Sequence, residues 1–169
     1  MQVKNVGLIG MPGAGKSTVG VVLAKALAKV FVDTDLLIQQ ARGCLLQELI
    51  CAEGVGGFLA AEEQVVLGLQ TENAVIATGG SVVYSALAMQ HLKTQGWIVY
   101  LKLPLAVVEQ RIDNMASRGI AMAAGQKFSD LYWERAPLYE KYADLVVEAS
   151  ALTLEETVAA IVRRLKNTR

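Results

Sequence analysis

The sequence predicts an α/β domain in three layers, with a five-stranded parallel sheet flanked by helices on both faces. Short, almost wholly apolar runs alternate with longer segments in which apolar residues recur at helical spacing. Glycines or acidic residues directly follow several of the apolar runs, at the strand ends where parallel sheets bind their ligands. With 169 residues and 53% of them hydrophobic, the chain has the size and apolar content of a single compact domain.

The apolar runs are the expected strands. They are short, bounded by turn residues and rich in β-branched side chains. They cover residues 6–9, 30–32, 74–77, 97–103 and 145–147.

The segments between these strands have the spacing of amphipathic helices. A break is expected at residues 42–43, and the glycine-rich residues 54–57 separate two helices. Pro137 is expected to interrupt a further helix, and residues 153–156 form a capping box that opens the last one. The expected helices cover residues 18–29, 36–53, 58–69, 85–93, 105–116 and 130–142, with the last beginning at 153.

The loop after the first strand matches the pattern G-x-x-x-x-G-K-[ST]. In such a loop, backbone N–H groups surround phosphate oxygens, the lysine reaches the β and γ phosphates, and the hydroxyl binds Mg²⁺. The helix that begins here presents the positive end of its dipole to the same phosphates. We therefore predict a site for a nucleoside triphosphate, ATP, with Mg²⁺, contacted by Gly13, Ala14, Gly15, Lys16, Ser17 and Thr18.

Two acidic residues, Asp33 and Asp35, follow the second strand. In extended chain, residues two apart point the same way, so both carboxylates are expected to face the phosphate loop. Two acids indicate two roles, one in the Mg²⁺ shell and one at an acceptor hydroxyl. The alternative is that one of them only caps the following helix.

Further candidates lie later in the chain. Gly79 and Gly80 follow the third strand, where they permit close approach of backbone to a substrate or a phosphate, or simply form a tight turn. Arg111, Arg118 and Arg135 are the candidate cations for phosphoryl transfer beyond the phosphate loop, although surface arginines are common.

The segment around Arg118 is rich in small residues and has weak periodicity over residues 118–128. It is either a mobile flap over the site or an ordinary surface connection. An arginine in a flap would close onto the transferring phosphate and exclude water.

The composition argues against several partners. The formal net charge is zero, so no basic surface favours nucleic acid. No signal peptide is expected, and charged residues interrupt the longest apolar stretches, so no membrane partner is expected. We expect a cytoplasmic monomer.

Together these motifs resemble the shikimate kinase family. The resemblance covers essentially the whole chain and includes the phosphate loop, the paired acids, the Gly79–Gly80 stretch and the string Glu134-Arg135-Ala136-Pro137-Leu138-Tyr139, which resembles the family's ER-x-PLY signature. It implies a P-loop kinase fold, with residues 1–169 as one domain and a candidate lid at 117–129.

What the resemblance implies for activity is ATP- and Mg²⁺-dependent phosphorylation of a hydroxyl group on shikimate, a small cyclic carboxylic acid. Catalysis would then involve Lys16, Asp35 and Arg118. Ser17 and Asp33 would hold the metal, Arg111 would lie against the adenine, and Asp35, Gly79, Gly80 and Arg135 would contact the substrate.

The chain departs from the family pattern at three positions. Leu59 stands where the family has an arginine that grips the substrate carboxylate, Ser81 stands where it has a third glycine, and Gly119 follows Arg118 where it has a proline. These changes leave two alternatives open. One is a kinase of this fold for another small hydroxylated acceptor, and the other is a nucleotide-binding protein that has lost transfer activity.

Overall fold

The computed structural model describes residues 4–113 and 119–167. Within these residues, five strands form one sheet in the order β2-β3-β1-β4-β5, and every neighbouring pair is parallel. The predicted fold class is therefore confirmed. The strands are β1 (Asn5–Ile9), β2 (Val30–Asp33), β3 (Ala74–Ala77), β4 (Gly96–Lys102) and β5 (Leu145–Glu148).

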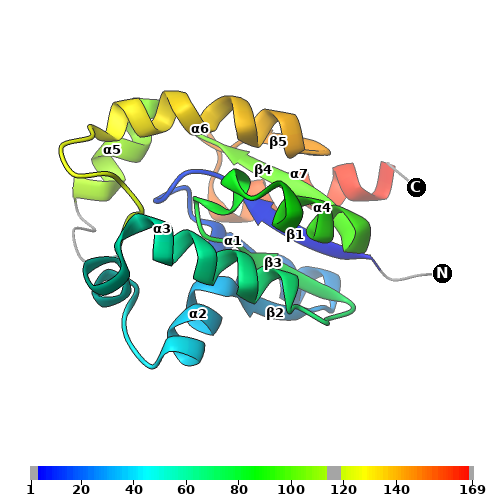
Figure 1. The fold of residues 1–169 in the computed structure, drawn as a ribbon. Helices are drawn as coiled ribbons and strands as arrows, with labels where there is room; N and C mark the ends of the chain where they lie inside the picture. The colour runs from blue at the N-terminus through cyan, green and yellow to red at the C-terminus, as the bar shows by residue number, and fades with distance from the viewer. Residues whose placement is uncertain (1–3, 114–118, 168–169) are drawn as a thin grey trace.

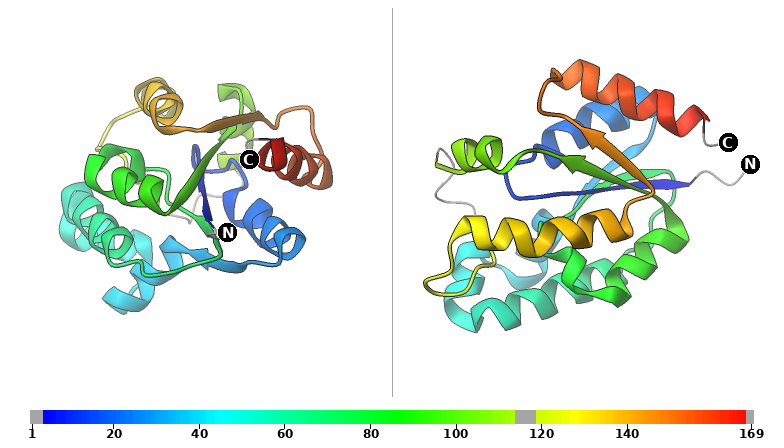
Figure 2. Two further views of the ribbon diagram at one scale, coloured as in Figure 1. Left: turned by 90° about the vertical axis from the view of Figure 1, so that its right-hand side faces the viewer. Right: turned by 90° about the horizontal axis from the view of Figure 1, so that it is seen from above.

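Helices cover both faces of the sheet, which gives the three layers seen in Figure 2, with α1 and α7 on one face and α3, α4 and α6 on the other. The helical segments of the described chain are α1 (Lys16–Leu27), α2 (Thr34–Arg42), α3 (Leu46–Leu67), the 3₁₀ turn η1 (Val82–Tyr84), α4 (Ala86–Gln95), α5 (Leu105–Asp113), α6 (Phe128–Tyr142) and α7 (Leu154–Asn167).

The centre of the sheet is fully buried. Every residue of β1 and β3 is buried, as expected for strands covered on both faces. Leu8 of β1 is paired with Ala77 of β3 and with Val99 of β4. Because the strands are parallel, their carboxyl ends meet at one edge of the sheet. The loops that carry the predicted motifs leave from this edge (Figure 1).

Some expected helix bounds differ from the structure. The helix after β2 begins at Thr34 instead of residue 36, while the expected break at residues 42–43 is confirmed, since α2 ends at Arg42 and its C-cap Gly43 has a left-handed φ of 67°. α3 spans the predicted separator as one segment, but two helical parts meet there at a kink, at Gly54, whose φ of 71° and ψ of 179° depart from helical geometry. A glycine adopts that conformation without strain, so the chain kinks there instead of forming a loop.

The expected interruption at Pro137 is wrong, because α6 continues through it. Proline removes the hydrogen bond to the carbonyl four residues earlier, which belongs to Trp133. Trp133 and Pro137 are both exposed, so the missing bond lies on the solvent side of the helix. The opposite side of the helix carries a buried stripe of Leu131, Arg135 and Tyr139, which packs the helix on both sides of the proline.

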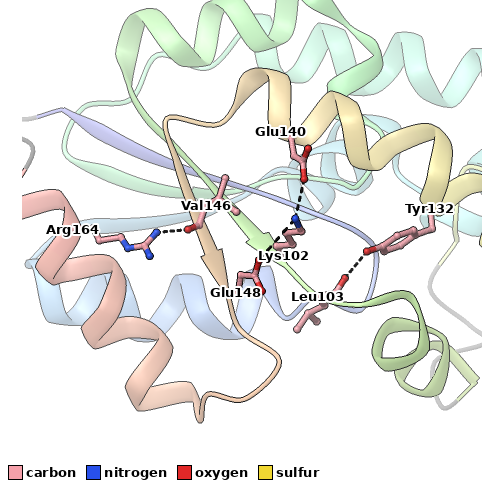
Figure 3. A network of polar contacts seen from close by, with 7 residues as sticks. All are labelled: Lys102, Leu103, Tyr132, Glu140, Val146, Glu148 and Arg164. Atoms are coloured by element: carbon pink, nitrogen blue, oxygen red, sulfur yellow. Dashed lines mark hydrogen bonds and ion pairs between the residues drawn. The ribbon is translucent and has the colours of Figure 1, made fainter.

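Polar contacts join α6 and β5 to β4 (Figure 3). The Lys102 ammonium lies 3.0 Å from a Glu140 carboxylate oxygen and 3.9 Å from one of Glu148. The Tyr132 hydroxyl donates to the Leu103 carbonyl at 2.9 Å. The ion pairs are exposed and contribute at most about 1 kcal/mol each, so apolar packing dominates this edge.

Within the described part of the chain, no single helix is long and apolar enough to cross a membrane, and the sole combination that meets those criteria is α2 with α3, bent by 87°.

Candidate active site

A cavity of about 200 Å³ lies at the carboxyl edge of the sheet and joins the predicted phosphate loop to the predicted acceptor residues. Part of its wall comes from α3 and from the segment before α6, through Leu46, Phe58, Gly119, Ile120 and Ala121. The predicted site residues that line it are Gly13, Gly15, Lys16, Ser17, Thr18, Asp35, Gly79, Gly80 and Arg135.

The phosphate loop has the backbone conformation that its glycines allow. Gly13 and Gly15 have φ values of 82° and 88°, in the left-handed region that other residues rarely adopt. α1 begins immediately afterwards at Lys16, so its N-terminus faces the cavity. The arrangement provides the anion site expected of a helix N-terminus that follows a glycine-rich turn.

The Lys16 ammonium is folded against the loop. It donates to the carbonyls of Gly10 at 2.8 Å and Met11 at 2.9 Å. Burial lowers the pKa of Lys16 to about 8, partly opposed by the nearby Asp35 carboxylate. At neutral pH the group therefore stays mostly protonated. An ammonium has three donors, so one remains for a phosphate oxygen.

The paired acids take separate positions. Asp33 accepts from the Ser17 hydroxyl at 2.7 Å and, through its other oxygen, from the Asp35 amide at 3.0 Å. The capping role therefore belongs to Asp33, while Asp35 stands in the first turn of α2 and lines the cavity. The extended backbone expected at Asp35 was wrong, because the helix begins at Thr34, but the Asp35 side chain lines the cavity with the phosphate loop as expected.

The Ser17 and Asp33 oxygens fit a magnesium ion. They are a hydroxyl and a carboxylate in contact with each other beside the phosphate loop, and Mg²⁺ prefers such hard oxygen ligands. No group of three or more His, Cys, Asp and Glu side chains suited to a metal occurs among the described residues. Mg²⁺ usually keeps several waters and is held by one or two protein ligands plus substrate phosphates, so the pair is sufficient.

Arg135 projects from α6 and is 1% exposed. Its Nη2 donates to the Ala121 carbonyl at 2.6 Å and its Nε to the Tyr84 hydroxyl at 3.1 Å. Its Nη1 faces Gly80, where an added Cβ would lie 3.2 Å away. A fixed guanidinium beside the cavity is suited to bind a carboxylate.

Other predicted residues lie around the cavity without lining it. Ala14 is buried within the loop, and its amide donates to the Met11 carbonyl at 3.1 Å. Arg111 contacts the loop from outside, with Nη1 3.2 Å from the Gly13 carbonyl. Arg118 lies outside the described residues, so its predicted role stays a prediction.

Sequence reasoning missed Glu62, a carboxylate of α3 that is 2% exposed. Its Oε2 accepts from the Ser81 hydroxyl at 2.6 Å, and its Oε1 has no hydrogen-bond partner among the described residues. Burial raises the pKa of Glu62 to about 7. A Cβ on Gly79 would lie 2.2 Å from Glu62 Oε1 and 3.0 Å from Asp35 Oδ1, so both carboxylates adjoin this glycine.

A signal for Glu62 existed in the sequence. Phe58, Glu62 and Val66 recur at four-residue intervals, and all three are buried. A lone carboxylate in such an apolar stripe is unusual and indicates either a polar partner or a site.

The three departures from the family pattern have structural counterparts. The Ser81 hydroxyl donates a hydrogen bond to the Glu62 carboxylate. Leu59 does not line the main cavity but a neighbouring one of about 170 Å³, which also touches Glu62 and Ser81. Gly119 has a φ of 56°, which proline cannot adopt, and an added Cβ would lie 2.8 Å from the Gln47 amide nitrogen.

Comparisons with known proteins agree with this geometry. The family model described as "Shikimate kinase" matches residues 12–166. Shikimate kinases of Dechloromonas aromatica and Thermodesulfovibrio yellowstonii are 34% and 35% identical to the chain, covering 95% of it and 89% and 94% of their own lengths. The solved shikimate kinase from Acinetobacter baumannii in complex with shikimate superposes with a TM-score of 0.91 at 30% identity, covering 99% of this chain and 95% of that one. The protein therefore belongs to the shikimate kinase family.

Proposed function

We propose that the protein transfers the γ-phosphate of ATP to a hydroxyl group of shikimate. The observation that carries the proposal is that one cavity brings together the phosphate loop, the Asp35 carboxylate and the Arg135 guanidinium. Family membership supports ATP as the donor. The similar Acinetobacter baumannii enzyme was solved with shikimate bound, which supports shikimate as the acceptor.

The phosphate loop forms the donor half of the proposed site. Residues 13–18 hold the phosphates through backbone N–H groups and the Lys16 ammonium, which neutralises charge on the transferring group. Arg111, which already contacts the loop, lies against the adenine. Arg118 acts as the lid cation within a lid over 117–129. Residues 119–121 support this lid, since they line the cavity and Gly119 lies against the backbone of residues 46–47 at the start of α3.

Asp35 and Arg135 form the acceptor half. Asp35 accepts the proton of the acceptor's hydroxyl group. The hydroxyl oxygen forms a bond to the γ-phosphorus while the bond between the γ-phosphorus and the bridging oxygen breaks, and ADP leaves with that oxygen. Arg135 holds the acceptor carboxylate, and the backbone of Gly79 and Gly80 allows the acceptor to approach closely. These contacts orient the hydroxyl for in-line attack.

Ser17 and Asp33 are the proposed Mg²⁺ ligands. The ion, when bound, supplies charge neutralisation at the β and γ phosphates. Asp33 also fixes the start of α2 through the Asp35 amide, so it aligns the acceptor base with the phosphate loop.

Because position 59 is leucine and not the arginine of the family pattern, the proposed site has one charge-assisted contact fewer with the carboxylate of the acceptor. Such a contact is worth about 1.5–3 kcal/mol, or about tenfold to a hundredfold in affinity. We therefore expect a high KM for shikimate. Leu59 is also the specific observation that favours the second candidate, a related hydroxylated acid as acceptor.

A coupled ADP-release assay tests the proposal. ADP release is expected with ATP, Mg²⁺ and shikimate and not without an acceptor, and mass spectrometry of the product is expected to show one added phosphate on shikimate. A panel of small hydroxy acids, run beside shikimate, tests the second candidate. Faster turnover of another acid would replace shikimate as the acceptor. ATP binding without turnover of any acid would reject the kinase activity.

We also propose that the active species is a monomer, since one chain supplies both halves of the cavity. Light scattering during gel filtration is expected to give the mass of one chain, 18.1 kDa. A dimer mass would contradict this proposal without affecting the activity assigned to the site.

A further inference from the structure

Tyr84 stands between the substrate-facing arginine and its sequence neighbour. It ends the 3₁₀ turn η1, while Glu134 and Arg135 are adjacent on α6. The Tyr84 hydroxyl lies 2.5 Å from Glu134 Oε1 and accepts from Arg135 Nε at 3.1 Å. The Arg135 guanidinium also lies over the Tyr84 ring, 5.0 Å from its centroid.

These contacts have one consistent direction of proton donation. A phenol has a single proton and can accept as well as donate. Burial, followed by the hydrogen bond to Glu134, raises the pKa of Tyr84, so the hydroxyl stays protonated. The guanidinium donates to the tyrosine and the tyrosine donates to the carboxylate. Arg135 is thereby held at Nε by a hydrogen bond and on its face by the ring.

The arrangement leaves a defined part of Arg135 for a ligand. The described hydrogen bonds use Nε and Nη2, while Nη1 faces Gly80 at the cavity wall. Arg135 is the one arginine that lines the described part of the cavity. Its orientation is therefore decisive for binding an acceptor carboxylate.

The same network reaches the segment before α6. Glu134 Oε2 accepts from Gln126 Nε2 at 3.3 Å, and Gln126 Oε1 accepts from the Ala123 amide at 3.2 Å. Arg135 Nη2 adds a bond to the Ala121 carbonyl, and Ala121 lines the cavity. The arginine and this wall of the cavity are thus held by the same set of side chains.

We propose that Tyr84 and Glu134 are positioning residues that orient Arg135 toward the acceptor carboxylate. The inference rests on the proposed function, because it assigns Arg135 the acceptor. It gives a role to Glu134, which belongs to the family-specific string but has no direct place in phosphoryl transfer. It also identifies Tyr84, which no sequence motif indicated.

Steady-state kinetics with both substrates varied test the proposal. Tyr84→Phe keeps the ring and removes the hydroxyl, and is expected to raise the KM for shikimate about fivefold; Tyr84→Leu also removes the ring and is expected to raise it about twentyfold. The KM for ATP is expected to stay within about twofold of wild type, because the phosphate loop makes none of these contacts. Glu134→Gln keeps an acceptor oxygen and is expected to cause a smaller increase than Tyr84→Phe.

Tyr142→Phe is the matched control. Tyr142 lies on the same helix, and its hydroxyl makes none of the described hydrogen bonds, so its loss is expected to leave both KM values unchanged. A proportional change in both KM values of the Tyr84 variants, or no change in either, would overturn the inference.

A second measurement separates this inference from the proposed function. In ¹H–¹⁵N NMR spectra, the Arg135 Nε–H is expected to exchange slowly with water in the wild type and rapidly in Tyr84→Phe, with assignment by Arg135→Lys. Equal exchange in both proteins refutes the tether whatever the activity. If wild type does not phosphorylate shikimate, the proposed function fails, and the exchange rates still decide whether Tyr84 holds Arg135.

Discussion

Replacing Glu62 by glutamine is expected to flatten the pH dependence of the protein's stability. The Glu62 carboxyl is buried on α3 and accepts from Ser81. Burial is the main cause that raises its pKa from 4.5 to about 7, and the Asp35 carboxylate raises it further. The Ser81 hydrogen bond and the charges of Arg135 and Lys16 oppose the shift without cancelling it.

The sign of the effect follows from proton binding. Between its unfolded and folded pKa values, Glu62 binds more protons in the folded state than in the unfolded state. Its contribution to the free energy of unfolding is therefore largest at low pH and is lost as pH rises through about 7. A shift of this size amounts to about 3 kcal/mol in full, and about 2.5 kcal/mol is lost between about pH 5 and about pH 8. Glutamine cannot ionise, and its amide oxygen can still accept from Ser81, so this component disappears.

Urea unfolding at several pH values measures the effect. Over that interval the free energy of unfolding of wild type is expected to fall by about 2.5 kcal/mol more than that of Glu62→Gln. Glu63→Gln is the matched control, because Glu63 is the next residue on the helix and accepts from Ser85, yet is only half-buried. Its stability is expected to follow the pH dependence of wild type. If the free energy of unfolding of wild type and of Glu62→Gln changed with pH by the same amount, the argument from burial would be refuted.

The remaining predictions concern activity. Lys16→Ala is expected to abolish phosphoryl transfer, because the ammonium is the cation inside the phosphate loop; near-normal turnover in the ADP assay would remove Lys16 from its proposed role. Asp35→Asn keeps the shape of the side chain and removes the base, so kcat is expected to fall by about a hundredfold or more while the affinity for ATP changes little; the reverse pattern would assign Asp35 to the metal or to the helix start. Leu59→Arg is expected to lower the KM for shikimate by about tenfold, with no change in the KM for ATP; an unchanged KM for shikimate would indicate a different acceptor or a pocket that position 59 does not reach.

The donor half of the site was predictable because its chemistry is local. The phosphate loop is one continuous stretch whose glycines, lysine and hydroxyl follow a fixed spacing, and its conformation follows from left-handed glycines and from the helix that begins at Lys16. The sheet was predictable for a similar reason, since strands buried on both faces form continuous apolar runs.

The acceptor half was predicted less completely because its residues come from separate elements. Glu62 and Ser81 are nineteen residues apart, and Tyr84 and Arg135 fifty-one. The resemblance to a family identified Arg135 and included Glu134 in its signature string without a role, and it did not indicate Tyr84. Glu62 is buried on α3 at helical spacing from Phe58 and Val66, but the sequence analysis did not identify it, and spacing alone does not identify its partner.

Local rules were less accurate for three backbone features. Pro137 is accommodated within α6 because buried residues on either side keep the helix packed. The break expected at residues 54–57 is present, but it is confined to a kink at Gly54. Asp35 lies in a helix and not in extended chain, although it still lines the cavity.

Local patterns in the chain were enough to predict the class of fold, the phosphate loop and the carboxyl edge where ligands bind, because each depends on neighbouring residues and on the period of the apolar pattern. The tertiary structure alone decided the pairing of Glu62 with Ser81, the hold of Tyr84 on Arg135, and the placement of Leu59 in the adjoining cavity. These contacts depend on how helices pack on the sheet and bring distant side chains to one edge, which no local pattern in the chain encodes.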